Sequence, residues 1–280
     1  MVDYLKEMLN SWKLYKNNLI ILVIFLFSSF AFILFLGIAA LEFLLIFLIG
    51  TGGSFTFANF TFSPLVITLI TLFLIINYLL STLLNSFFQS MLLVMYDQIC
   101  RKGKTSLNNL IVAGKKYLYI NFKIKVLRLF FIYLLPLIVL FILPLLFLIS
   151  KQYVISIILA ILFGGIYFIY LIFVMFGLLF LHPIITTTKS KSAIAILKQS
   201  FNYLFNMHIS IFATWGLGTL LSIAVMIVMF PLVIMERLMA TIFPPIVALT
   251  IPIRTIIQVF LVYYIGLFKF KIYYTENKIK

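Results

Sequence analysis

Acidic residues are scarce in this chain, since only 6 of its 280 residues are Asp or Glu, against 21 Lys and Arg. It also has only two histidines and one cysteine, Cys100. One cysteine excludes an intrachain disulfide, and without a His/Cys/Asp/Glu cluster we predict no metal site and no cofactor. The sequence contains no G-x-S-x-G, P-loop or Ser/His/Asp set, so we predict no catalytic residue and no enzymatic activity.

Charge of either sign is rare as well, at 10% of the residues, whereas 65% are hydrophobic. The mean hydropathy of +1.26 is too high for a soluble domain of this length, which needs a polar surface. Apolar runs longer than about 18 residues recur along the chain, as in membrane-spanning helices. The composition therefore predicts an all-α integral membrane protein that forms a single domain over residues 1–280.

Six apolar stretches are long enough to span a bilayer, which takes about 20 helical residues. Prolines at positions 136, 144 and 231 predict kinks in the third and fifth stretches. The third stretch follows a basic segment and ends at Ile149, and the other five are predicted at residues 19–41, 65–99, 154–185, 209–235 and 243–268.

Basic residues cluster between these stretches, with 18 of the 21 Lys and Arg in four patches. With 4 acidic residues, the patches carry a net charge of +14, and the opposite side carries +1. Because translocation disfavours basic loops, we predict a multi-pass protein of the cell membrane with both termini cytoplasmic. A nucleic-acid partner would need a soluble domain to present this charge, so we expect anionic lipid headgroups as the counter-charge instead.

The basic segments also show helical periodicity. Residues 105–125 and 192–208, and the N-terminal segment before the first stretch, place apolar side chains every three to four positions, which predicts amphipathic helices on the cytoplasmic membrane surface. The candidate contacts to lipid headgroups are the lysines of the two internal segments, Lys115, Lys116, Lys123, Lys125 and Lys198.

Each predicted surface helix leads into a pair of spans, and short segments at 11–15, 113–117 and 200–204 can be aligned. This pattern predicts three repeat units, at residues 1–99, 104–185 and 190–268. The alternative is that any basic connector between two spans becomes amphipathic.

One segment carries a family resemblance. His182-Pro183-Ile184-Ile185 is followed by Ala193, Ala195, Leu197 and then Lys198-Gln199-Ser200-Phe201. Over residues 174–224 the chain resembles the membrane domain attached to some glycerophosphodiester phosphodiesterases, and related six-span proteins of bacteria and archaea. That group often has an acidic residue after the proline, where this chain has Thr186, Thr187 and Thr188. The resemblance implies a six-span fold but no phosphodiesterase activity, which belongs to a soluble domain.

The second span carries a polar stripe. Asn77, Ser81, Asn85 and Gln89 recur at every fourth position, and Thr82, Ser86 and Ser90 form the adjoining row. In hydrocarbon such groups need partners, so the stripe either joins packed helices or lines a groove for a substrate or lipid headgroup.

Arg254 lies 11 residues after Phe243, about 16 Å along a helix. We include Arg254 and Glu42 with Asn77, Ser81, Asn85 and Gln89 as candidate ligand-binding residues, because an ionisable side chain within a span suggests function. The alternative is a structural ion pair or a side chain that extends to the interface. Asn59 begins a glycosylation sequon in a predicted outer loop.

The sequence therefore predicts a non-enzymatic transport or lipid-handling component with a polar groove on its second span. The alternative is an accessory or scaffold protein that binds anionic lipid, or a membrane-protein partner, through its basic surface helices. A polar stripe that is packed dry would exclude the groove.

Overall fold

A computed structural model describes residues 2–52, 63–105, 110–188, 192–239 and 245–278. The structure is 91% helical, and the described residues include no strand. Six of its helical stretches are long and apolar enough to cross a membrane, which confirms the predicted all-α fold with six spans. The chain is therefore a multi-pass membrane protein. Asn59, the candidate glycosylation site, lies outside the described residues.

Three helices, α1, α3 and α8, begin at recognisable capping residues. Asp3, Ser63 and Ser192 each accept a hydrogen bond from a backbone N–H in the first turn of the helix that follows. The elements are α1 (Tyr4–Lys16), α2 (Ile21–Gly50), α3 (Pro64–Lys102), α4 (Leu110–Leu127), the π-helix η2 (Arg128–Leu134), α5 (Leu135–Ile149), α6 (Tyr153–Gly177), α7 (Leu181–Thr187), α8 (Ala193–Asn206), α9 (His208–Met239) and α10 (Pro245–Glu276).

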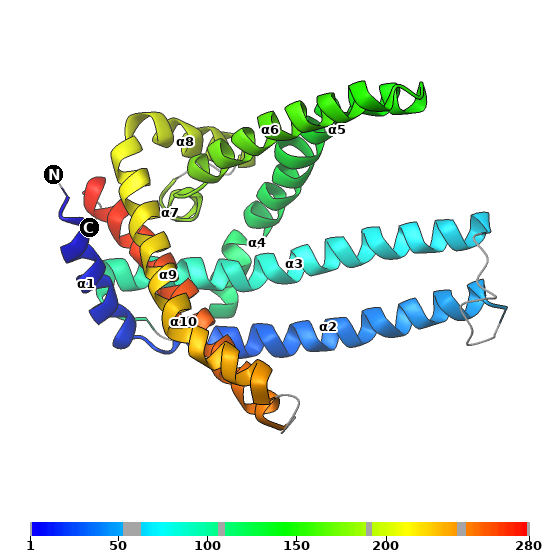
Figure 1. The fold of residues 1–280 in the computed structure, drawn as a ribbon. Coiled ribbons are helices and arrows are strands. Elements are labelled where there is room, and N and C mark those ends of the chain that lie inside the picture. Colours follow the sequence, from blue (N-terminus) through cyan, green and yellow to red (C-terminus); the bar gives the residue numbers. More distant parts are fainter. Residues whose placement is uncertain (1, 53–62, 106–109, 189–191, 240–244, 279–280) are drawn as a thin grey trace.

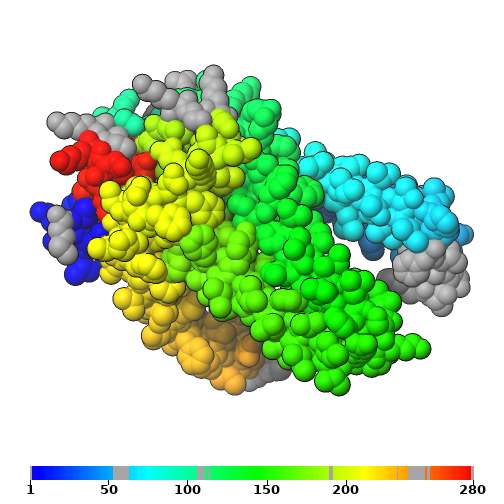
Figure 2. Space-filling view, turned by 90° about the horizontal axis from the view of Figure 1, so that it is seen from above, coloured from blue at the N-terminus to red at the C-terminus, as the bar shows by residue number. Residues whose placement is uncertain are grey.

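The spans form three hairpins, α2/α3, α5/α6 and α9/α10, that diverge from a common base where both termini lie (Figure 1). We call the opposite ends of the hairpins the tips. Seen from above, the outer part of α3 stands clear of the α5/α6 hairpin (Figure 2). Large apolar side chains along the diverging spans are exposed, as expected for surfaces that contact lipid.

The packed core lies in the base. The helices α1, α4, α7 and α8, the basal halves of α3 and α10, and the basal ends of α2 and α9 contribute side chains to one cluster there. Tyr15, Ile99, Ile184, Leu267 and Ile272 are completely buried in it. The base, rather than the set of spans, is therefore the part that resembles the interior of a globular protein.

Two basal helices contact the hairpin that precedes them along the chain, and a third, α1, contacts the last hairpin. The helix α4 packs on α3, α8 packs on α6 and α7, and α1 closes the ring by packing on α10. The Tyr264 hydroxyl of α10 donates to the Met8 carbonyl of α1 at 2.8 Å. Contacts between each basal helix and a neighbouring hairpin are expected of repeat units arranged in a ring. The division of the chain into three units stays a prediction.

The predicted surface helix at 105–125 is instead part of a longer membrane element. The helix α4 begins at Leu110 and continues through η2 and α5, so that one apolar stretch runs from Gly114 to Ile149. Within α4, the described residues Gly114, Asn121 and Ile124 are buried. Ile111, which lies on the apolar face predicted to contact the membrane, is 62% exposed. A Cβ at Gly114 would lie 2.7 Å from Cγ of Met91, so the glycine allows α4 to approach α3 closely.

The predicted fourth span agrees with the structure, in which Tyr153–Thr187 is one candidate span, whereas the predicted end of the sixth span does not. A break at residues 178–180 separates α6 from α7, where Pro183 has no N–H to donate to the preceding turn. The sixth span does not end near Phe268 in a basic tail, because α10 continues to Glu276. Phe268, Phe270, Ile272, Tyr273 and Tyr274 are all buried, so this segment belongs to the core.

Candidate functional site

The polar stripe on α3 consists of two rows in different surroundings. Thr82, Ser86 and Ser90 are buried, and the Asn121 amide of α4 donates to Oγ of Ser90 at 2.7 Å. The Ser86 and Ser90 hydroxyls also donate to carbonyls of their own helix. This row joins α3 to α4, which is the structural role expected of small hydroxyl residues between packed helices.

The other row lines open space. Ser81, Asn85 and Gln89 face three successive cavities of 330, 590 and 340 Å³ along α3. The first and second share Phe32 and Asn85 as lining residues. The second and third share four more, Gln89, Leu92, Val262 and Tyr263. We call these three connected cavities the α3 groove.

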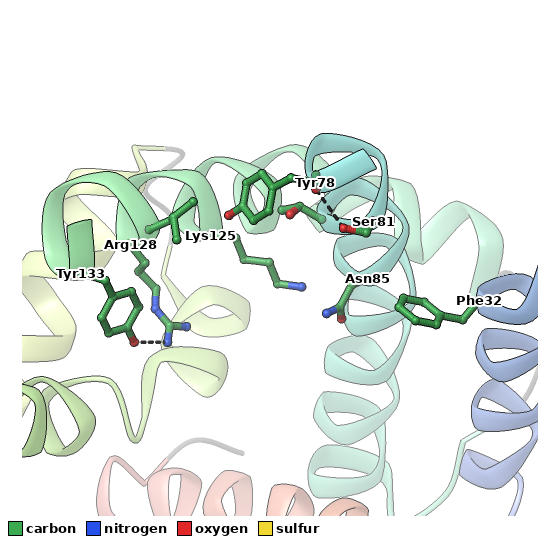
Figure 3. Close-up of a pocket in the computed structure, with 9 residues that line it drawn as sticks. Phe32, Tyr78, Ser81, Asn85, Lys125, Arg128 and Tyr133 are labelled. Atoms are coloured by element: carbon green, nitrogen blue, oxygen red, sulfur yellow. Dashed lines mark hydrogen bonds between the residues drawn. The ribbon is translucent and has the colours of Figure 1, made fainter. Parts of the chain in front are cut away.

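The first cavity of the groove is basic. Lys125 of α4 and Arg128 and Tyr133 of η2 line it opposite Tyr78, Ser81 and Asn85 of α3 (Figure 3). In Figure 3 the Lys125 and Asn85 side chains point toward each other across the cavity. We call this cavity the basic pocket.

The π-helix gives the basic pocket its geometry. Pro136 has no N–H, and a wider turn just before it accommodates its ring, with the Leu135 N–H donating to the Phe130 carbonyl five residues earlier. Residues five apart share a face in a π-helix, whereas in an α-helix of 3.6 residues per turn they do not. Arg128 and Tyr133 therefore meet, and Nη2 of Arg128 donates to the Tyr133 hydroxyl at 2.9 Å.

The cavity at the basal end of the groove has a different character. The Gln89 amide and the His182 ring are in contact, with 2.5 Å between the two Nε2 atoms. Tyr96, Tyr263 and Lys269 complete its polar lining. The groove therefore has a basic pocket at one end and an aromatic, amide-containing pocket at the other.

Three predicted ligand-binding residues near the tips, Asn77, Glu42 and Arg254, do not join the groove. The Asn77 amide donates to Oε2 of Glu42 at 2.8 Å, which links α3 to α2. Arg254 pairs with Glu236 at 3.1 Å, which links α10 to α9. Neither Glu42 nor Arg254 lines the three cavities. Because the hairpins diverge, a polar group near a tip finds its partner within its own hairpin.

The five predicted headgroup lysines lie in two environments. Lys115, Lys116, Lys123 and Lys198 are exposed on α4 and α8. Two of them lie over tyrosine rings of α4, Lys116 at 5.0 Å and Lys123 at 4.4 Å from the ring centroid. Lys125 alone is half-buried and faces the groove.

Two carboxylates of the base, Glu276 and Asp97, have structural partners. Glu276 accepts hydrogen bonds from Tyr4, Tyr203 and Ser210, which connects α10 to α1, α8 and α9. Asp97 of α3 accepts from Tyr274 of α10 and pairs with Arg101. Burial and the hydrogen bond to the Glu276 carboxylate raise the pKa of Tyr203 above its usual range, so that it remains a donor at neutral pH.

The groove contains residues that sequence reasoning missed, namely Arg128, Tyr133, Tyr78 and His182. A signal for the basic side was present, because Asn121, Lys125 and Arg128 are spaced by four and three and so share one helical face. This signal was missed because residues 105–125 were interpreted as a surface helix, whose polar face would contact water.

The segment with the family resemblance forms a defined contact. The Ser200 hydroxyl donates to the Gly177 carbonyl at 2.5 Å, and Phe201 stacks on Phe173 with centroids 5.9 Å apart, so both hold α8 against α6. Comparison of the chain with protein-family models, curated proteins and solved structures finds no match. The resemblance to the phosphodiesterase-associated membrane domain therefore stays a prediction. Among the described residues, no group of three or more His, Cys, Asp or Glu could hold a metal ion.

Proposed function

We propose that this protein is a transport or lipid-handling component of the cell membrane, without catalytic activity of its own, and that the α3 groove receives the polar part of an amphiphilic molecule. One observation carries the proposal: Ser81, Asn85 and Gln89 line cavities, whereas Ser86 and Ser90 of the adjoining row are buried beside α4 and only Thr82 of that row reaches the first cavity. A stripe that served only to join helices would be buried along both rows.

The surroundings of Asn85 support a ligand role. Its side chain is exposed and makes no hydrogen bond within the described part of the chain. Its donors and its acceptor are therefore available to the polar group of a ligand. The middle cavity adds the apolar side chains of Ile33, Leu84 and Phe88 beside this amide.

The proposed orientation places the base in the cytoplasm. It rests on the concentration of 18 of the 21 Lys and Arg in the segments at that end. The groove then lies at the cytoplasmic end of the spans.

The test is leaflet exchange of a fluorescent phospholipid in vesicles that contain the purified protein. We expect Asn85→Leu combined with Gln89→Leu to lower the exchange rate about tenfold, because the polar headgroup loses its hydrogen-bond partners. Thr71→Leu is the control, since Thr71 is exposed on α3 outside the groove and bonds only its own helix. Exchange no faster than in protein-free vesicles would exclude the proposal, as would equal rates in the groove variant and the control.

A scaffold role is the second candidate, and the exposed lysines Lys115, Lys116, Lys123 and Lys198 favour it. Near an anionic surface each would contribute about 1 kcal/mol of attraction. If this role is correct, replacing the four lysines by Gln weakens binding to phosphatidylglycerol vesicles, whereas the groove variant has no effect on any measured property.

A further inference from the structure

The basic pocket holds two cations whose charges are not neutralised by the protein. The Lys125 ammonium is shielded from solvent and has no hydrogen-bond partner, and the same is true of Nε of Arg128. The described residues that line the pocket include no Asp or Glu. Two neighbouring cations that lack both water and a counter-ion destabilise a structure, so this arrangement favours an anion as a ligand.

We propose that the basic pocket binds a phosphate group, held between Lys125, Arg128 and the amide of Asn85. A phosphate presents several acceptor oxygens around one centre, and the donors here approach from two sides, Lys125 and Arg128 from α4 and η2 and Asn85 from α3. The guanidinium matches the planar arrangement of two phosphate oxygens, and the ammonium adds a point charge. Tyr133 positions Arg128 through its hydroxyl.

The depth of the pocket indicates a phospholipid headgroup as the source of the phosphate. Asn85 lies 21 residues after the start of α3, and Lys125 lies 24 residues before the end of α5. At 1.5 Å per residue, these positions are about 32 and 36 Å from the tips. Since the hydrocarbon core is about 30 Å thick, the pocket lies at the level of the headgroups nearer the base.

The neighbouring cavity lies on the basal side of the basic pocket. It shares Phe32 and Asn85 with the pocket and continues between α2, α3 and α10 toward Gln89 and Leu92. An acyl chain joined to the phosphate would extend the other way, from the pocket along the lipid-facing sides of the spans toward the tips. This inference rests on the proposed function, because it names the class of molecule that the groove would receive.

The experiment compares two double variants that each remove two positive charges from the same continuous helix. Lys125→Gln with Arg128→Gln empties the basic pocket, and Lys115→Gln with Lys116→Gln removes exposed charges from α4. Each protein is placed in phosphatidylcholine nanodiscs, with and without phosphatidylglycerol. The measurements are the unfolding midpoint and the amount of phosphatidylglycerol retained in native mass spectrometry.

We expect phosphatidylglycerol to raise the unfolding midpoint of the wild type and of the exposed-lysine variant, but not that of the pocket variant. Retention should fall at least about tenfold in the pocket variant alone, since two charge-assisted contacts are lost. In phosphatidylcholine alone, the pocket variant should be as stable as the wild type or more stable, because the choline of this lipid balances the charge of its phosphate and leaves the two cations of the wild type without a net counter-charge. Equal responses in the two double variants, or a wild type that responds neither to phosphatidylglycerol nor to inorganic phosphate, would overturn the proposal.

Two additional measurements distinguish the source of the phosphate and allow for a double variant that does not fold. Inorganic phosphate added to phosphatidylcholine discs tests the source: stabilisation by phosphate without stabilisation by phosphatidylglycerol supports the site and assigns it to a soluble anion. Lys125→Gln alone leaves the bond between Arg128 and Tyr133 intact, and it should still weaken retention if the double variant fails to fold. If leaflet exchange persists in the pocket variant, only the proposed phosphate site is excluded. If the wild type retains phosphatidylglycerol but does not exchange lipid between leaflets, only the proposed transport function is excluded.

Discussion

The base and the tips of this molecule are held together by different interactions. In the base, eight helices contribute to one core, and the two carboxylates Asp97 and Glu276 connect α10 to its neighbours. Toward the tips, the cross-helix polar contacts lie within single hairpins, such as Asn77 with Glu42 and Arg254 with Glu236. Apolar side chains gain little by leaving lipid for another apolar surface, so only close packing and polar contacts can join helices. The groove lies where one kind of region gives way to the other.

The largest expected effect comes from truncating a core aromatic side chain in the base. Phe270 is 1% exposed, so Phe270→Ala should lower the free energy of unfolding by about 3–5 kcal/mol through the cavity it leaves. Phe131 is 63% exposed in η2, and Phe131→Ala should cost much less. Unfolding in detergent micelles measures both variants, and similar losses would contradict the contrast between base and spans.

The carboxylate of Glu276 should be the next most important contact. Glu276→Gln keeps the size of the side chain but removes the charge that Tyr4, Tyr203 and Ser210 donate to, at a cost of about 2 kcal/mol. The same unfolding measurement checks it, with Glu42→Gln near the tips as the matched change. A greater loss for Glu42→Gln would reverse the order of importance of the two regions.

Alkaline pH should weaken the base through Tyr203. Its pKa is raised in the folded protein by burial and by Glu276, so its stabilising contribution is complete below the usual Tyr pKa of about 10 and is lost as the pH rises through the higher folded value. Tyr203→Phe should therefore unfold with a shallower dependence on pH above 10. An unchanged pH profile would mean that Tyr203 does not lose its proton on unfolding.

The turn between α3 and α4 offers a smaller test. Gly103 ends α3 with a φ of 75°, and Gly103→Ala should cost about 1–2 kcal/mol because a Cβ is disfavoured in this left-handed conformation. Gly165→Ala is the control, because a Cβ at this helical position meets no atom within 4 Å. If both variants have the same unfolding free energy, the left-handed turn contributes nothing to the base.

The smallest effect is expected near the tips. Asn77→Leu removes the hydrogen bond to Glu42, and polar contacts between membrane helices are worth about 0.6 kcal/mol on average. A double-mutant cycle with Glu42→Gln measures the coupling free energy between the Asn77 and Glu42 side chains. A coupling free energy above about 2 kcal/mol would show that the outer hairpin depends on this bond more strongly than such contacts usually allow.

Sequence patterns predicted the spans well because hydropathy reports directly on transfer into lipid. The capping residues Asp3, Ser63 and Ser192 follow equally local rules. Helix packing was less predictable. Periodicity identified two rows in the α3 stripe, but it could not assign one to the contact with α4 and the other to open space.

The candidate site shows the same division. Ser81, Asn85 and Gln89 were predicted, and the structure places them along the groove. The meeting of Arg128 with Tyr133 depends on the wider turn before Pro136, which no count of 3.6 residues per turn would suggest. Lys125 was predicted to touch headgroups from an exposed helix, whereas it faces the groove from a helix packed on α3.

The sequence alone determined the class of this protein, its number of spans and the segments that carry its charge, because each follows from the free energy of moving one stretch of chain between water and lipid. Only the tertiary structure decided that the core lies in the base, that the end of α10 is buried there and that two cations face one polar row of α3. These features depend on which helices touch. Lipid-facing side chains are interchangeable along the chain, so the choice of partners is made by shape and hydrogen bonding.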